Sequence, residues 1–389
     1  MYNICEKICI NNMNNITPYL PDEKKQIFFD IETTGFSSNS DICYLIGVVY
    51  NDKGTIKYNQ WFADTPREEE EIIRSFCIFL DSCTSVIHFN GDGFDIPFIT
   101  ERGKKYGIAL DFSRLESIDL LKHTRNIRNL LRLENYKQKT LERFLEINRE
   151  DKYSGGELIN IYKRYNAFKE PSDRDLLLLH NRDDILGMLP LYSILSYENI
   201  TNKNFVLKNI TLSSLCSKEE NITKDGVTNF LDFTLGLSVS VPKQIITAIP
   251  VNNMFSSKKD TDSFSTGNEM ISILIKDDLL KISVPVYNTE LKHFYSDYKN
   301  YFYLPEEDKS IHKSVGAYVD SSFKEKAKKE NCYVKNVSSY IPVPLSYEDK
   351  FLTFRKSYND NSNYLELNSA FLNDKNAVFN YISDIIDAI

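Results

Sequence analysis

Asp30 and Glu32 are the first residues whose types and spacing suggest chemistry. They lie in the segment Gln26–Glu32, which predicts a strand whose other face carries Ile27, Phe29 and Ile31. Side chains two apart on a strand share a face, here about 7 Å apart. Two such carboxylates repel each other and are costly to remove from water. A divalent cation offsets that cost, and Mg²⁺ and Mn²⁺ prefer carboxylate ligands. The pair predicts a metal site, although the polar face of an exposed edge strand would show the same pattern.

A third carboxylate, Asp95, follows a glycine-rich turn. Residues 85–89 predict a short strand, and Asn90-Gly91-Asp92-Gly93-Phe94-Asp95 comes next. The two glycines permit a tight turn into a helix that runs toward Tyr106. The helix dipole alone favours a carboxylate at such a position. The alternative is that Asp95 is delivered to the end of the sheet where Asp30 and Glu32 lie.

A late predicted helix, residues 172–188, carries His180 and Asp184. Ser172 can cap this helix, with Asp175 three residues on. Residues four apart share one helix face, so the pair either lies on the surface or places an imidazole beside a bound metal. In the second case the imidazole can deprotonate a water. Pro190 predicts a kink or a break near residues 187–189.

Several further elements must position these residues. Residues 44–50 form a continuous apolar run suited to a buried strand, and residues 56–62 return as a third strand, so the first three strands read as an antiparallel meander. Thr65, Pro66 and Glu68 predict a capping box that opens a helix. Residues 115–121 predict another strand. A basic segment follows, which is either the solvated face of helices or a surface that tracks phosphates: Lys122, His123, Arg125, Arg128, Arg132, Lys137, Lys139 and Arg143.

Composition limits the class of protein. The 389 residues favour two or three domains, and 42% hydrophobic with 26% charged residues is typical of a soluble globular protein. The formal net charge of -8 argues against coating nucleic acid by bulk charge, but not against a local basic groove. The seven scattered Cys predict reduced thiols and a cytoplasmic location. We expect no signal peptide and no membrane association.

The second half changes character after residue 204. Residues 206–211, 227–235, 271–275 and 279–286 predict strands. The polar stretch 256–268 predicts a mobile loop, residues 309–329 a basic helix, and residues 376–389 a final amphipathic helix. The aromatic and basic stretch 293–303 is either a packed cluster or a surface that stacks bases.

Taken together and in this order, the motifs resemble the three exonuclease motifs of the DEDD group of the ribonuclease H-like superfamily. The resemblance is closer to its YprB-type subfamily of predicted nucleases and covers about residues 26–200. It rests on these motifs: Phe29-Asp30-Ile31-Glu32-Thr33-Thr34-Gly35, Leu45-Ile46-Gly47-Val48, Asn90-Gly91-Asp92-Gly93-Phe94-Asp95-Ile96-Pro97, Asp119-Leu120-Leu121, Ser154-Gly155 and His180-Asn181-Arg182-Asp183-Asp184-Ile185-Leu186.

The resemblance implies that Asp30, Glu32, Asp95 and Asp184 bind two divalent cations, Mg²⁺ or Mn²⁺, that bridge the scissile phosphate. One ion would activate water and the other would stabilise the leaving 3′-oxygen. His180 departs from the tyrosine or the longer histidine spacing found elsewhere in the group, but it is similar to the YprB type. It would serve as general base or orient the water.

Three more residues, Thr33, Asn90 and Phe94, are expected to contact the substrate, with Asn90 either orienting the phosphate or holding the turn. Asp183 is the rival for the fourth carboxylate. Helical register places Asp184, and not Asp183, on the same helix face as His180.

The sequence therefore predicts an α/β fold: a ribonuclease H-like mixed sheet flanked by helices at residues 26–200. A lead-in at 1–25 precedes it, and an α+β domain of unknown type follows at 205–389. The expected activity is metal-dependent hydrolysis of DNA or RNA phosphodiester bonds, as a 3′-5′ exonuclease acting on single-stranded 3′ ends. The alternatives are a catalytically inactive nucleic-acid-binding protein on the same fold and a structure-specific endonuclease.

Overall fold

The computed structural model describes residues 1–8, 26–150, 153, 155–214, 227–254, 270–348 and 350–389. Its internal contacts divide the chain into two units, each described here by itself. The first unit is Met1–Glu198 with Val241–Lys243, and the second is Asn199–Ser240 with Gln244–Ile389. None of the helices in the described part of the chain combines the length and apolar character that crossing a bilayer requires.

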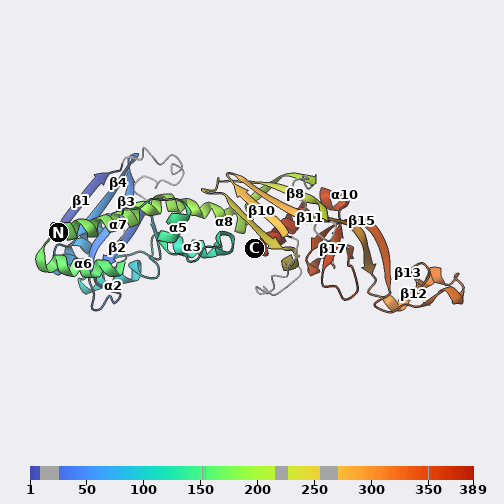
Figure 1. Ribbon diagram of the computed structural model, residues 1–389. Helices are drawn as coiled ribbons and strands as arrows, with labels where there is room; N and C mark the ends of the chain where they lie inside the picture. The colour runs from blue at the N-terminus through green and yellow to red at the C-terminus, as the bar shows by residue number, and fades with distance from the viewer. Residues whose placement is uncertain (9–25, 151–152, 154, 215–226, 255–269, 349) are drawn as a thin grey trace. The chain divides into compact units, whose positions relative to one another are not determined.

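The first unit is built on a six-stranded mixed sheet in the order β1-β4-β3-β2-β5-β6. Figure 1 labels β1, β4, β3 and β2 of this sheet. The predicted meander is confirmed, because β2-β3 and β3-β4 are antiparallel. β5 pairs parallel with β2, and β6 pairs parallel with β5. Parallel strands point their carboxyl ends to the same edge, so the segments that follow β2, β5 and β6 leave from one edge of the sheet. The strands are β1 Tyr2–Lys7, β2 Gln26–Thr33, β3 Cys43–Asp52, β4 Thr55–Phe62, β5 Ser85–His88 and β6 Glu116–Asp119.

Helices cover the sheet on both faces. Neighbouring residues on a strand point to opposite faces, and the Phe29 ring stacks on Phe76 of α1 at 5.6 Å, whereas the Phe28 ring lies edge-on to Tyr192, just beyond α7, at 5.9 Å. α7 packs on β2 and β3. The helices are η2 Pro66–Glu68, α1 Glu69–Leu80, α2 Asp95–Lys105, α3 Leu120–Asn126, α4 Arg128–Leu131, α5 Gln138–Phe144, α6 Gly155–Phe168, α7 Pro171–Leu191, η3 Tyr192–Tyr197 and α8 Glu198–Thr201, the last of which lies mainly in the second unit.

Two predicted helix caps differ from the structure. Thr65 is the N-cap residue of the short helix η2 and Pro66 its first residue, as predicted, but the Thr65 side chain makes no cap bond. The Glu68 carboxylate accepts instead from the backbone N–H of Asp64 at 2.8 Å and pairs with the amino group of Met1 at 2.6 Å. Ser172 lies inside α7, because the helix begins one residue earlier at Pro171, whose fixed φ suits a first turn.

Three further expectations differ from the structure. The predicted break at residues 187–189 is absent, since α7 continues through Pro190 to Leu191 and passes directly into η3. The predicted lead-in contains a strand, because β1 pairs with β4 as an edge strand; residues 9–25 lie outside the described residues. The strand expected over residues 115–121 ends at Asp119, where the carboxylate caps α3 by accepting from the N–H groups of Leu121 and Lys122.

The second unit is rich in sheet, as predicted. An eight-stranded sheet runs β16-β17-β15-β11-β10-β9, with β8 on β11 and β7 on β8, and a three-stranded sheet has the order β13-β12-β14. The strands are β7 Phe205–Ser214, β8 Val227–Leu237, β9 Ile245–Pro250, β10 Met270–Lys276, β11 Leu279–Phe294, β12 Tyr301–Leu304, β13 Lys309–His312, β14 Glu325–Lys326, β15 Tyr333–Val343, β16 Thr353–Phe354 and β17 Asn363–Glu366.

The final amphipathic helix is confirmed as α11, Lys375–Asp387, and the loop expected at 256–268 lies outside the described residues. The basic helix expected at 309–329 is wrong. That segment begins as a hairpin strand, β13, whose turn from β12 ends with Asp308 in a left-handed conformation (φ 47°). Short elements fill the rest of this unit: η4 Val251–Met254, η5 Tyr298–Asn300, α9 Lys313–Gly316, η6 Ser321–Phe323, η7 Leu345–Tyr347 and α10 Ser369–Asn373.

Candidate metal centre

The strand β2 carries Asp30 and Glu32 toward α7. Asp30 pairs with Gly47 of β3 across the ladder. A Cβ at Gly47 would lie 2.1 Å from Asn181 Oδ1 and 2.1 Å from Ile185 Cδ1, so only glycine lets α7 approach the sheet this closely. Because of this approach, Asn181 Nδ2 donates to Asp30 Oδ2 at 2.8 Å.

Asp95 reaches the same strand from the turn after β5. Asn90 adopts a left-handed conformation (φ 64°), and its carbonyl accepts from Gly93 N–H at 3.0 Å. The chain then enters α2 at Asp95, which is buried. The backbone N–H of Ile31, between the two β2 carboxylates, donates to Asp95 Oδ1 at 3.3 Å. The structure therefore brings the third predicted carboxylate to β2.

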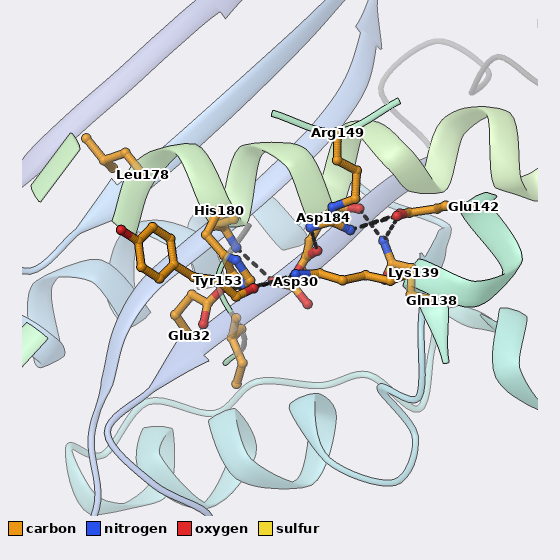
Figure 2. Close-up of polar contacts among 12 residues, drawn as sticks. Asp30, Glu32, Gln138, Lys139, Glu142, Arg149, Tyr153, Leu178, His180 and Asp184 are labelled. Carbon is orange, nitrogen blue, oxygen red and sulfur yellow. Dashed lines mark hydrogen bonds and ion pairs between the residues drawn. The ribbon is translucent and has the colours of Figure 1, made fainter. Parts of the chain in front are cut away.

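His180 and Asp184 complete the group from α7 (Figure 2). His180 Nε2 lies 3.2 Å from Asp184 Oδ2 and 3.7 Å from Glu32 Oε1. Ligand atoms of these three residues all lie within 4.8 Å of one another. Asp183 takes a different place, since its Oδ2 accepts from the backbone N–H of Glu150 at 2.8 Å.

The electrostatics of the group are those of a cation site. Burial raises the pKa of Asp30 well above its usual range, and the charges of Asp95, Glu32 and Asp184 raise it further, while Asn181 opposes the shift. Burial also raises the pKa of Asp95, to about 7. These carboxyls resist losing their protons because burial and the neighbouring carboxylates both disfavour the charged form, so the donor set fits hard divalent ions.

Asp184 behaves differently. Burial would raise its pKa, but the hydrogen bond with His180 and the charges of His180 and Arg149 hold that pKa below its usual value. Its carboxylate is therefore divided between two cationic or potentially cationic partners: Arg149 Nη2 pairs with Oδ1 and His180 with Oδ2.

Sequence reasoning missed the residues that hold these ligands in place. Arg149 also pairs with Glu142 at 2.8 Å, and the Glu142 side chain is 1% exposed. Gln138 Nε2 donates to Glu142 Oε1 and to the Asp184 carbonyl, each at 2.8 Å. Figure 2 shows Arg149, Glu142 and Gln138 gathered near Asp184 of α7. Nothing local in the sequence distinguishes Arg149 from the exposed arginines before it.

A second missed group fixes Asp30. Gln60 of β4 donates from Nε2 to Asn181 Oδ1 at 2.9 Å and to the carbonyl of Leu178 at 3.0 Å. Asn181 is consequently oriented with its amide nitrogen toward Asp30. Its place directly after His180 in the motif was the available signal.

The three residues expected to contact substrate, Thr33, Asn90 and Phe94, make different contacts in the structure. Thr33 Oγ1 donates to the carbonyl of Gly35 at 2.7 Å, which fixes the turn after β2. Asn90 holds the turn before α2 through its backbone. The half-buried Phe94 ring lies 5.9 Å from the ring of Phe36, which is 86% exposed. Their contact with substrate stays a prediction.

The basic segment lies on α3, α4, α5 and the turns between them. His123 is half-buried against Glu198, at 3.0 Å, and Lys122 pairs with Asp92 at 2.5 Å. The arginines and the remaining lysines of the segment are exposed. Both interpretations of this segment therefore stand.

A second cluster, His88, Asp92 and Asp119, also brings potential metal ligands together. Its atoms are engaged by protein donors. Gly91 N–H donates to His88 Nδ1 at 3.0 Å, and Asp119 Oδ1 accepts from Asn90 N–H at 2.9 Å. The structure gives this cluster a part in holding the turn after β5.

Comparison with known proteins assigns the first unit to a class. Residues 27–196 match the family model described as RNase_H superfamily. This part of the chain is an RNase_H superfamily domain, and its mixed sheet with flanking helices has the expected α/β fold.

Particular relatives are distant. A PolC-type DNA polymerase III from Caldanaerobacter subterraneus subsp. tengcongensis is 28% identical over 147 residues, which cover 32% of this chain and 10% of that protein. The chain thus spans about a tenth of the length of the curated relative that it matches.

Solved structures show only a loose likeness. A family B DNA polymerase from Pyrobaculum calidifontis is 20% identical, with a TM-score of 0.35. The match covers 45% of this chain and 25% of the polymerase chain. A metal-free E. coli ExoI–ssDNA complex is 10% identical with a TM-score of 0.29, covering 64% of each chain. At TM-scores this low, the likeness carries no conclusion.

Proposed function

We propose that the first unit is a metal-dependent nuclease of the DEDD group and the YprB type. It would hydrolyse phosphodiester bonds of DNA or RNA as a 3′-5′ exonuclease on single-stranded 3′ ends. The observation that most supports this is the group formed by Glu32, His180 and Asp184, whose ligand atoms lie within 4.8 Å of one another beside the proton-retaining carboxyls of Asp30 and Asp95. The RNase_H superfamily assignment and the PolC-type relative support the same class.

The proposed ligands are the four carboxylates, Asp30, Glu32, Asp95 and Asp184, for two Mg²⁺ or Mn²⁺ ions. When bound, such ions polarise a phosphoryl oxygen and lower the pKa of a coordinated water. His180 would accept the proton of the attacking water, or orient that water. Asp184 Oδ2, 3.2 Å from Nε2, stabilises the imidazolium that results.

Two other functions compete with this proposal. A catalytically inactive binding protein on this fold would gain by losing carboxylates, because they repel phosphates in the absence of metal; this chain keeps all four, and ligand atoms of two of them, Glu32 and Asp184, lie within 4.8 Å of each other. A structure-specific endonuclease would use the same ligands and differ in where it cuts.

The test uses the full chain with single- and double-stranded DNA and RNA, labelled at either end, in Mn²⁺, Mg²⁺ or EDTA. We expect a ladder from the 3′ end that requires metal and disappears with Asp30→Asn. The matched control is Asp175→Asn, an exposed carboxylate on α7 paired with Arg174. Internal products would favour the endonuclease. If no substrate were cleaved in a metal-dependent way, and Asp30→Asn and Asp175→Asn gave the same result, the nuclease proposal would be refuted.

A further inference from the structure

The second unit contains a pocket of about 790 Å³ that no part of the proposed nuclease uses. Residues 293–298, where β11 ends and the chain approaches β12, line it together with residues from 348–358 and Lys329. This volume falls within the range of about 300–1,000 Å³ that is typical of ligand sites. The pocket therefore has the size of a binding site.

Aromatic rings form much of the lining. The Tyr295 ring stacks on Tyr301 at 4.4 Å with an angle of 14° between planes, and Phe294 lies edge-on to Tyr358 at 5.6 Å. Tyr298 also lines the pocket and is only half-buried. Partly exposed rings held by other rings offer flat surfaces on which nucleobases can stack.

Cations lie around these rings. Lys329 Nζ is 5.9 Å from the centre of the Tyr298 ring, and Lys350 is exposed at the pocket wall. Arg355 is fixed, because its Nε donates to Asn363 Oδ1 at 2.7 Å and its guanidinium pairs with Glu348. That pair is neutral as a whole, so the two lysines outnumber the remaining acid, Asp297.

A local excess of positive charge in a chain of net charge -8 points to an anionic ligand. Aromatic faces together with amines are what a segment of single-stranded nucleic acid requires, since rings take the bases and amines take the phosphates. A buried neutral ligand would not need the lysines, and a simple anion would not need the rings.

We propose that this pocket binds a short segment of single-stranded nucleic acid, with a base stacked on Tyr298 and phosphates at Lys329 and Lys350. The aromatic stretch 293–303 then has a binding role of its own. This inference goes beyond the proposed nuclease and holds whether or not the first unit cuts.

The experiment measures binding without cleavage. The full chain carries Asp30→Asn, EDTA is present, and fluorescein-labelled oligo-dT and oligo-rU are titrated by anisotropy. We expect Tyr298→Ala to weaken binding roughly tenfold, the scale of one lost base stack, and Tyr298→Phe to retain it. Lys329→Glu should weaken binding and flatten its salt dependence.

Matched controls separate the pocket from general effects. Tyr318, 93% exposed and outside the pocket, gives Tyr318→Ala as the aromatic control. Lys276, exposed on β10 and outside the pocket, gives Lys276→Glu as the charge control. Photocrosslinking of an iodouracil oligonucleotide should label the peptide that contains Tyr298.

Three results would overturn the inference. They are binding by Tyr298→Ala equal to that of Tyr318→Ala, crosslinks confined to the first unit, and competition by dTMP as strong as that by the oligonucleotide. The last would make the pocket a mononucleotide site. These three readouts measure binding and do not depend on cleavage. If the unsubstituted chain failed to cleave nucleic acid, the nuclease proposal would fail while this inference could still hold.

Discussion

Arg149 pairs through its guanidinium with Asp184 Oδ1 and with the buried Glu142 at the same time. A half-buried arginine in contact with a proposed metal ligand fixes that ligand's orientation before any ion arrives. Because Glu142 offsets the charge of Arg149, the pair adds no net charge to the site. Partners of this kind tune a metal centre without touching the metal.

Arg149→Gln tests this positioning role. The substitution leaves the Glu142 carboxylate, 1% exposed, without its cation, and breaking a buried pair on one side costs about 3–5 kcal/mol. We expect lower stability in urea unfolding and a loss of metal affinity of about 10–100-fold, which is typical for such partners. Calorimetric Mn²⁺ titration measures the second effect.

The double substitution Arg149→Gln with Glu142→Gln separates the two effects. It removes the uncompensated charge and should recover stability while metal affinity stays low. Arg143→Gln, an exposed arginine paired with Glu134 at 3.3 Å, is the matched control. If Arg149→Gln matched this control in Mn²⁺ affinity, the positioning role would be wrong.

Asp184→Asn and Asp183→Asn should differ sharply, although the residues are neighbours. Asp184 Oδ2 lies 3.2 Å from His180 Nε2, whereas Asp183 accepts from the Glu150 backbone. We expect Asp184→Asn to reduce metal-dependent cleavage by at least about a hundredfold and Asp183→Asn to act mainly on stability. Cleavage rates with saturating Mn²⁺ measure the difference, and a reversed order would identify Asp183 as the ligand.

The sequence could reveal Asp30, Glu32, His180 and Asp184 because each pair lies within one element, where periodicity decides which side chains share a face. The glycines before Asp95 indicated a turn in the same way. Local signals of this kind predict which element, and which face of it, carries each residue. The parallel pairing of the strands then brings these residues to one edge of the sheet.

The rest depends on contacts between distant segments, for which a single sequence has no periodicity. Gln60 reaches Asn181 from a strand 121 residues earlier. The reciprocal bond of the capping box at Thr65 is absent partly for the same reason, because the distant amino group of Met1 pairs with the Glu68 carboxylate, which also accepts from the nearby Asp64 N–H. The basic run after residue 309 has a helical composition, but the turn that ends at Asp308 makes a hairpin there.

Gly47→Ala should disturb the metal centre by separating α7 from the sheet on which it packs. The added methyl would lie 2.1 Å from both Asn181 Oδ1 and Ile185 Cδ1, so α7 must shift away from β3 and from the rest of the sheet. We expect a loss of about 1–3 kcal/mol in unfolding free energy, the usual cost of overpacking, and weaker Mn²⁺ binding because Asn181 no longer orients Asp30. Gly156→Ala on α6, where the added methyl meets open space, is the control. Equal Mn²⁺ affinity in both variants would show that α7 tolerates the shift.

The metal-free protein should lose stability as pH rises from about 4 to about 7. Burial, and then the charges of Asp119 and Asp184, raise the pKa of Asp95 to about 7 against the opposing Ile31 N–H, and Asp30 shifts in the same direction. The unfolded chain loses these protons near pH 3.9, so across this window the folded state binds more protons and stability falls as pH increases.

Mn²⁺ binds the deprotonated carboxylates, so its stabilising effect should grow over the same window. Urea unfolding at about pH 5 and about pH 7, in EDTA and in Mn²⁺, measures both trends. Asp95→Asn should flatten the EDTA slope, whereas an unchanged slope would assign the proton uptake to other groups.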